Sequence, residues 1–172
     1  MNKILNILLV LLVIGYVLYY FYKQPKYING EMAPQFTAQL IDGTEFSLSE
    51  MNGKYVLLDF WGSWCGPCRH ENPSIVKLYD RFNGKTFADA SGFEVISVAI
   101  ENNESRMKNA IVKDNLKWKY HIPQLDRFKS PLVIQYGVKE IPTKYLINPD
   151  GNIMSVNQTA DDIERLLSER LK

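Results

Sequence analysis

The stretch from Phe60 to Pro73, FWGSWCGPCRHENP, contains both cysteines of this 172-residue chain, Cys65 and Cys68. An apolar run precedes it, and apolar residues recur after it at helical spacing, so it lies where a predicted strand ends and a predicted helix begins. Two cysteines separated by two residues can bind zinc, attach a haem, form a structural bridge or exchange electrons with other thiols. The neighbouring residues select among these roles.

Three of the four roles fit the sequence poorly. A structural zinc site takes about four ligands, and beyond the two cysteines the chain offers only His70 and His121. Covalent haem attachment needs a histidine directly after the second cysteine, where this chain has Arg69. A disulfide between such close residues closes too small a loop to add much stability. We therefore expect reversible thiol chemistry.

The start of a helix supplies what this chemistry needs. Unpaired backbone N–H groups and the helix dipole stabilise an anion there, so the pKa of the Cys65 thiol should lie below its free value of about 8.5. We predict that Cys65 is the nucleophile and that Cys68, one turn inside, attacks the mixed disulfide and releases the partner. Pro67 is tolerated in a first helical turn and fixes the backbone between the sulfurs.

Strand and helix patterns alternate on either side of the motif. Buried strands are predicted at Tyr55–Phe60 and Phe93–Ile100, with a helix over Pro67–Phe82 between them. The other predicted segments are a hairpin of Phe36–Leu40 with Thr44–Leu48, a helix over Glu104–Leu116, an ambiguous segment Trp118–Leu125 in which Pro123 limits any strand to an edge, a short helix over Pro131–Tyr136, a hairpin of Thr143–Ile147 with Asn152–Val156, and a last helix capped by Thr159. This order predicts an α/β domain whose mixed sheet is covered by helices on both faces.

The N-terminus carries a separate apolar segment. From Ile4 to Tyr22 there is no charged side chain, and as a helix this run would reach roughly 28 Å, about the thickness of a bilayer's hydrocarbon core. It ends in aromatic residues followed by Lys23, as at a membrane interface. A cleaved signal peptide is the alternative, but the run is longer than a usual signal core and no small-x-small site follows it. The predicted organisation is a transmembrane anchor (1–22), a linker (23–32) and a folded domain (33–172).

The charge distribution gives no sign of a nucleic-acid partner. Formal net charge is +1, and Lys3 is the only charged side chain before Lys23, so the other 19 basic side chains balance 19 acidic ones. Neither a basic field nor a long run of like charge is present in the sequence. We therefore expect no binding to nucleic acid.

Trp64-Cys65-Gly66-Pro67-Cys68 is identical to the thioredoxin active-site sequence. From about Gly30 to Lys172 the chain resembles the membrane-anchored, thioredoxin-like disulfide reductases of the bacterial cell envelope, the TlpA and ResA type. The other residues that carry the likeness are Leu48–Phe60 before the motif, Pro73 in the active-site helix, the segment Gly137-Val-Lys-Glu-Ile-Pro-Thr143 and the turn Asn148-Pro-Asp-Gly151. The resemblance implies a thioredoxin-like fold with an N-terminal β-hairpin extension and a central insertion (101–140).

The resemblance also implies a partner-binding segment. Pro142 would follow a cis peptide bond, and the bend would present the backbone of Ile141 beside the sulfurs, where an extended partner can pair with it. The alternative is a trans proline that opens a strand. The remaining residues implied to contact the partner are Trp64, Gly66 and Pro67.

Two acidic residues are candidates for proton transfer. Glu71 matches a glutamate that lies near the thiols in ResA-type proteins and could take or give a proton as Cys68 changes state. Otherwise it is a solvated acid favoured near a helix N-terminus. Asp59 resembles the buried aspartate of thioredoxin, a proton acceptor for the inner cysteine; otherwise it occupies an edge position with its own hydrogen bond. The sequence does not rank the two.

Together these features predict an enzyme, a thiol–disulfide oxidoreductase that reduces envelope proteins. It would cycle the Cys65/Cys68 pair between dithiol and disulfide with no cofactor and no metal. Since the chain has only two cysteines, a separate donor, expected to be a membrane electron-transfer protein, must reduce it again. Gly-Pro between the cysteines resembles thioredoxin, at about −270 mV, more than the oxidising DsbA pair, at about −120 mV.

We expect a monomer, and the resemblance implies that it is anchored in the bacterial inner membrane. We expect the domain on the periplasmic side, because a short N-terminal tail with a translocated domain is the usual arrangement of such anchors. The main alternative function is a redox-sensitive binding module or holdase in cytochrome c assembly. A peroxidase usually requires a Thr-x-x-Cys nucleophile, which this chain lacks. The substrate could be an apocytochrome, a general envelope disulfide or a dedicated partner.

Overall fold

The structure of the protein is a computed structural model that describes residues 3–172. Its strands are β1 (Thr37–Gln39), β2 (Glu45–Ser47), β3 (Tyr55–Trp61), β4 (Phe93–Ile100), β5 (Tyr120–Gln124), β6 (Thr143–Ile147) and β7 (Ile153–Val156). Its helices are α1 (Lys3–Lys23), α2 (Gly66–Phe82), α3 (Glu104–Lys113), α4 (Pro131–Gln135) and α5 (Ala160–Ser168), with short 3-10 turns η1 (Leu48–Met51) and η2 (Arg127–Lys129).

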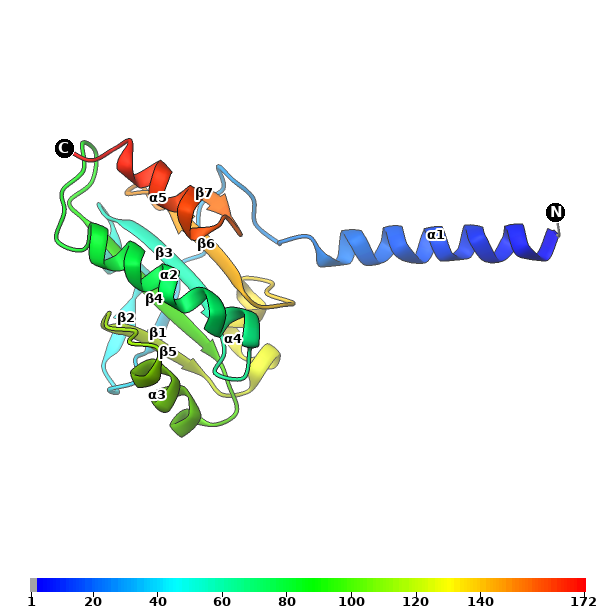
Figure 1. Ribbon diagram of the computed structural model, residues 1–172, viewed down its shortest axis with the longest axis horizontal. Helices are drawn as coiled ribbons and strands as arrows, with labels where there is room; N and C mark the ends of the chain where they lie inside the picture. Colours follow the sequence, from blue (N-terminus) through cyan, green and yellow to red (C-terminus); the bar gives the residue numbers. More distant parts are fainter. Residues whose placement is uncertain (1–2) are drawn as a thin grey trace.

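A five-stranded mixed sheet in the order β5-β4-β3-β6-β7 forms the centre of the domain (Figure 1). The strands β3, β4 and β5 are parallel to one another, while β6 and β7 are antiparallel to their neighbours. All seven residues of β3 are buried, since this strand is paired on both sides and covered on both faces. That environment explains why its sequence is a nearly continuous apolar run.

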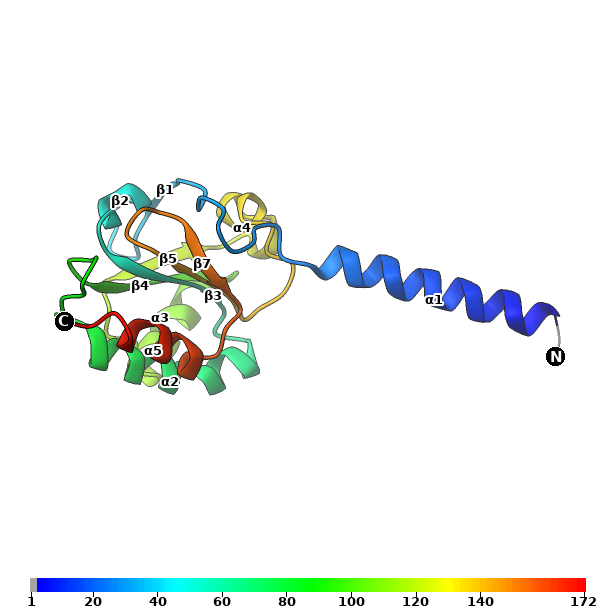
Figure 2. The same ribbon diagram turned by 90° about the horizontal axis from the view of Figure 1, so that it is seen from above.

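Side chains of β3 alternate between two hydrophobic clusters, as the pleat of a strand requires. Val56, Leu58 and Phe60 join one cluster together with residues of α4 and of the β1–β2 hairpin. Leu57 and Trp61 join the other, which contains residues of α2, α3 and α5. Figure 2 shows the two layers, with α2, α3 and α5 on one face of the sheet and α4 with the hairpin on the other. The prediction of a mixed sheet with helices on both faces is confirmed.

Helix α2 is built to hold the cysteine pair. Cys65 is its N-cap, Pro67 lies in its first turn and Pro73 lies inside it. Its buried residues recur every three or four positions, which turns one stripe of the helix onto the sheet: Cys68, Asn72, Ile75, Leu78 and Phe82. The motif therefore sits at the edge where the parallel strands β3 and β4 end.

The predicted elements are confirmed in type, and their boundaries shift by a few residues. Helix α3 stops at Lys113 and not at Leu116, because Asn115 adopts a left-handed conformation with φ 56° that no α-helix can continue. The ambiguous segment contains β5, an edge strand in which Pro123 pairs with Ala99 of β4. Both predicted hairpins form, and the Thr159 side chain caps α5.

The N-terminal segment forms α1, a helix with no buried residue and a mean hydropathy of 2.4 over its best window. It is long and apolar enough to cross a membrane, as an anchor or a signal sequence would be. The second half of the predicted linker is bound to the domain. Gly30 N–H donates to Ile153 O at 2.8 Å, and Ala33 N–H donates to Gly151 O at 2.9 Å. The first half of the linker and the end of α1 also contact the domain: the Tyr27 hydroxyl donates to Gln135 O at 3.2 Å, and Lys23 pairs with Glu140.

Replacing Leu57 by alanine should lower the free energy of unfolding by about 2 to 5 kcal/mol, because this fully buried side chain leaves a cavity under α2. Urea unfolding of the full-length protein in detergent measures the loss. The matched control is Val112→Ala on the exposed side of α3, where the side chain is 81% exposed and the change should stay within about 0.5 kcal/mol. Equal effects of the two substitutions would contradict the assignment of this core.

Candidate active site

The cysteine pair forms a disulfide at the N-terminus of α2, with an S–S distance of 2.04 Å. Cys65 is 5% exposed and Cys68 is 2% exposed, so a partner must approach closely to reach the sulfurs. The backbone N–H of Cys68 donates to Cys65 Sγ at 3.2 Å. In the reduced protein the same N–H group can stabilise a Cys65 thiolate, together with the positive end of the helix dipole. This arrangement supports thiol–disulfide exchange with Cys65 as nucleophile.

The loop before β6 forms the second wall of the site. The Ile141–Pro142 peptide bond is cis, which confirms the predicted geometry. The Ile141 carbonyl oxygen lies 3.9 Å from Cys65 Sγ. Because a disulfide sulfur carries no hydrogen, this contact is a close approach and not a hydrogen bond. The backbone of Ile141 thus lies beside the sulfurs, as predicted; its role in binding a partner stays a prediction.

The two candidate acids, Asp59 and Glu71, share one lysine that the sequence reasoning missed. Lys144 of β6 is the register partner of Asp59 in β3, and its Nζ donates to Glu71 Oε1 of α2 at 2.5 Å. The Lys144 side chain is only 7% exposed and that of Glu71 22%. Leu57 and Leu146, two residues away on the same strands, face α2, so Asp59 and Lys144 point toward α2 as well. The three charges lie between the sheet and the active-site helix.

Burial raises the pKa of Asp59 to about 7, and the nearby Glu71 carboxylate also raises it, while the Lys144 ammonium lowers it. Asp59 is therefore a buried acid that can gain or lose a proton near neutral pH, which suits a group that exchanges protons with a cysteine. The edge alternative for Asp59 is wrong, because β3 is the central strand of the sheet and Asp59 is 2% exposed. The proton-transfer roles of Asp59 and Glu71 stay predictions.

The residues predicted to meet a partner lie on the surface around the sulfurs. Gly66 and Pro67 are exposed, and Trp64 is 42% exposed. The Trp64 indole N–H donates to Ile100 O at 2.7 Å, and its ring lies edge-on to Phe128, with the Arg127 guanidinium 5.1 Å from the ring centre. The indole is thus held by the end of β4 and by the central insertion.

Neither histidine joins the site as a ligand. His70 is exposed on α2. His121 is buried in a stack with Trp118, and burial lowers its pKa to about 4. Within residues 3–172 there is no group of three or more His, Cys, Asp and Glu side chains that could hold a metal ion.

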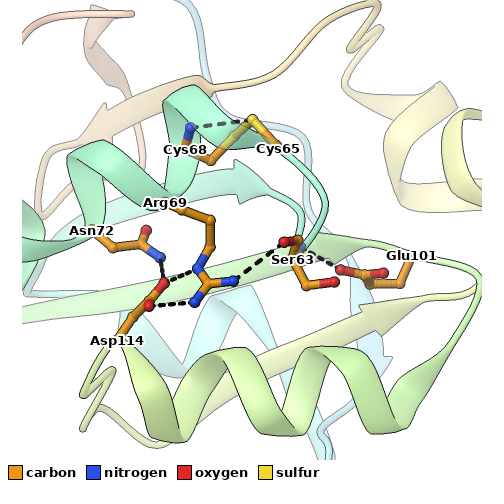
Figure 3. Close-up of polar contacts among 7 residues, drawn as sticks. All are labelled: Ser63, Cys65, Cys68, Arg69, Asn72, Glu101 and Asp114. Atoms are coloured by element: carbon orange, nitrogen blue, oxygen red, sulfur yellow. Dashed lines mark hydrogen bonds and ion pairs between the residues drawn. A yellow bond between two sulfur atoms is a disulfide. The ribbon is translucent and has the colours of Figure 1, made fainter.

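A second polar group missed by the sequence reasoning surrounds the loop before Cys65 (Figure 3). It consists of Glu101, Arg69, Asn72 and Asp114, which are joined to one another or to Ser63 by hydrogen bonds. An acid directly after the apolar strand Phe93–Ile100 was the one available signal for Glu101. The pairing of Arg69 with Asp114 joins residues 45 positions apart and has no signature in the sequence.

Changing Asp59 to asparagine should alter how stability depends on pH. An acid whose pKa rises from about 4 unfolded to about 7 folded favours the folded state at low pH, and that contribution is lost as pH rises from about 4 to 7. The variant does not lose this contribution. The difference in free energy of unfolding, variant minus wild type, should therefore rise by up to about 4 kcal/mol between pH 4 and 7 and then level off. Urea unfolding at several pH values measures the difference.

The control is Val112→Ala, an exposed residue that carries no titratable group, and this variant should follow the pH dependence of the wild type. If the Asp59→Asn and wild-type curves also remain parallel from pH 4 to 8, the raised pKa of Asp59 is refuted.

Comparison with known proteins agrees with this geometry. The AhpC/TSA family matches residues 29–156. Over 98% of its length the chain is 30% identical to the thiol-disulfide oxidoreductase ResA of Bacillus thuringiensis subsp. konkukian, covering 96% of that protein. It is 31% identical to ResA of Bacillus subtilis, over 88% of this chain and 80% of that one.

Among solved structures, the thioredoxin domain of a thiol-disulfide oxidoreductase from Bacteroides vulgatus superposes with a TM-score of 0.72 at 31% identity, over 84% of this chain and 98% of that domain. The fold, the pair of cysteines and the near full-length similarity lead to one conclusion: the chain belongs to the AhpC/TSA family of thioredoxin-like proteins and is a ResA-like thiol-disulfide oxidoreductase.

Proposed function

We propose that this oxidoreductase works as a reductant of protein disulfides on the outer side of the bacterial cytoplasmic membrane. The observation that carries the direction of transfer is Gly66-Pro67 between the two cysteines, in the first turn of α2. The same dipeptide occurs in thioredoxin, whose potential of about −270 mV makes it a reductant.

The reaction begins with the dithiol. The Cys65 thiolate attacks one sulfur of the partner disulfide, forming a mixed disulfide and releasing the other partner sulfur as a thiolate. Cys68, once deprotonated, attacks Cys65 Sγ, so that the Cys65–Cys68 disulfide forms and the second partner sulfur leaves. Two electrons pass to the partner, whose two thiolates take up protons. Asp59, with a pKa that burial raises to about 7, is the group we assign to accept the Cys68 proton. The Glu71 carboxylate raises that pKa further, and the Lys144 ammonium lowers it.

The partner chain binds in extended form along the loop before β6. The Ile141 carbonyl oxygen lies 3.9 Å from Cys65 Sγ, where a strand-like partner can pair with the backbone. Exposed Trp64, Gly66 and Pro67 form the opposite rim of the site. Backbone pairing places few demands on sequence, so recognition suits disulfides held in accessible or unfolded segments.

Contacts at the base of α1 support a site that faces the membrane. Lys139 donates to Tyr22 O, and Lys23 forms an ion pair with Glu140, directly before Ile141. In Figures 1 and 2 the N-terminal end of α2 lies on the side of the domain from which α1 extends. We infer that α1 is an uncleaved anchor, that the domain is periplasmic, and that a membrane-embedded protein returns electrons to the Cys65–Cys68 disulfide.

A Cys68→Ser variant should accumulate mixed disulfides between Cys65 and its partners, because the thiol that resolves them is gone. Non-reducing electrophoresis of membranes from cells that express the variant should show bands that disappear on reduction. The matched Cys65→Ser variant retains one thiol but not the nucleophile, and it should form at least tenfold less of these species.

Mass spectrometry of the trapped bands identifies the partners and separates substrates from the electron donor. If Cys68→Ser traps no partner while the wild-type protein keeps partners through non-covalent contacts alone, the protein is a redox-sensitive binding module and the proposed reductase function is wrong.

A further inference from the structure

Ser63, two residues before Cys65, is bonded on both sides of its backbone. Its N–H donates to Glu101 Oε1 at 2.5 Å, and its carbonyl oxygen accepts from Arg69 Nη1 at 3.3 Å. Figure 3 shows Ser63 between the Arg69 guanidinium and the Glu101 carboxyl group, with Cys65 further along the same loop. Neither bond belongs to a helix or a strand, so both depend on side chains placed there by the fold.

Glu101 is an acid buried at the end of β4. It follows β4 directly and is 0% exposed. Among residues 3–172, its Oε2 atom has no hydrogen-bond partner, which leaves the Ser63 N–H as the donor to this carboxyl group. Burying a carboxyl group with so few donors is costly. Because the Glu101 carboxyl group binds the Ser63 N–H, its position indicates that it holds this loop in place.

The second bond to Ser63, from Arg69, depends on Asp114, which belongs to the central insertion. Asp114, just after α3, accepts from Arg69 Nε and, at 2.5 Å, from Arg69 Nη2. Asn72, 1% exposed, donates to Asp114 Oδ2 at 2.7 Å. Burial acts to raise the pKa of Asp114, but the hydrogen bonds from Arg69 and Asn72 outweigh it and lower that pKa below its ordinary value. Asp114 is therefore a carboxylate that keeps Arg69 directed at Ser63.

The loop has little freedom to move between these contacts. Cys65 N–H donates to Gly62 O at 3.0 Å, and the Trp64 indole donates to Ile100 O at 2.7 Å. A Cβ atom on Gly62 would lie 2.8 Å from Trp64 Nε1 and 3.1 Å from Ile100 O. The backbone of residues 62–64 is thus packed against the end of β4, and it sets where Cys65 enters α2.

We propose that Glu101 and Asp114 are positioning residues for the nucleophile: by fixing both sides of Ser63, Glu101 directly and Asp114 through Arg69, they hold Cys65 Sγ over the first N–H groups of α2. Helix-end stabilisation of an anion falls off within one turn, so a small displacement of the sulfur weakens it. The insertion between β4 and β6 then has a defined task, because it supplies both acids. The proposal needs only exchange chemistry at Cys65 and does not depend on the direction of electron flow.

A positioning role and a purely electrostatic role of Glu101 predict opposite changes in the Cys65 pKa when Glu101 is replaced. If the carboxylate acted only as a negative charge near the thiolate, removing the charge would lower the Cys65 pKa. If it acts by accepting the Ser63 N–H, then glutamine, which retains an acceptor oxygen, should preserve the Cys65 pKa. Alanine, which has no acceptor, should raise it. The sign of the shift thus separates the two roles.

The test uses the full-length protein in detergent, in a Cys68→Ser background so that Cys65 is the single thiol. The rate of iodoacetamide alkylation against pH gives the Cys65 pKa. We expect Glu101→Ala and Asp114→Ala to raise that pKa by about one unit, so that alkylation below the wild-type pKa slows about tenfold. Glu101→Gln should stay within about threefold of the parent rate. Glu164→Ala removes a carboxylate paired with Arg81 on the far part of α2 and serves as control, with no change expected.

Thermal unfolding of each variant separates positioning from stability. Should Glu101→Ala not fold, the milder Asp114→Ala and Glu101→Gln variants carry the test. A folded Asp114→Ala or Glu101→Ala protein with an unchanged Cys65 pKa would show a merely structural role, and a lowered pKa in both Glu101 variants would show a charge effect; either result overturns the proposal. Because alkylation needs no partner protein, these results are independent of the trapping of substrates.

Discussion

The contact on which the rest of this structure depends is the placement of Cys65 Sγ at the N-terminus of α2, 3.2 Å from the Cys68 N–H and 3.9 Å from the Ile141 carbonyl oxygen. A cysteine elsewhere on the surface would be a weak nucleophile at neutral pH. Here the helix end supplies the stabilisation of the thiolate, and the cis-proline loop supplies a backbone edge for the partner. The central sheet fixes both, since α2 follows β3 and the Ile141 loop precedes β6, its antiparallel neighbour.

Two groups of buried charges flank this contact, one on each side of the motif. Asp59, Lys144 and Glu71 lie between the sheet and α2. Burial there raises the Asp59 pKa to about 7, which suits a group that exchanges protons near neutral pH. Glu101, with Arg69 and Asp114, binds the loop before the nucleophile. The first group is suited to move protons and the second to hold geometry. Charges are costly to bury, so their concentration around one pair of sulfurs indicates that function, more than stability, accounts for them.

The sequence predicted what depends on local pattern. The strand Phe93–Ile100 has its predicted bounds, because this mainly apolar run begins after Gly92 and ends before Glu101. The position of the cysteine pair at a strand-to-helix junction was likewise predictable from the sequence. The cis bond before Pro142 was predicted from the family resemblance. Contacts between distant residues were not predictable. Lys144 looks anomalous in its apolar strand until β6 pairs with β3 opposite Asp59, and Asp114 gains its role only when α3 packs beside α2.

Whether this pair donates electrons is measured most directly by the reduction potential of Cys65/Cys68. The full-length protein in detergent would be equilibrated in defined thiol–disulfide buffers, and the fraction of dithiol would be read by alkylation. A reductant of this kind should have a potential close to that of thioredoxin, about −270 mV. A potential above about −180 mV, in the range of disulfide isomerases and oxidases, would contradict it, because such a pair would take electrons from most envelope thiols.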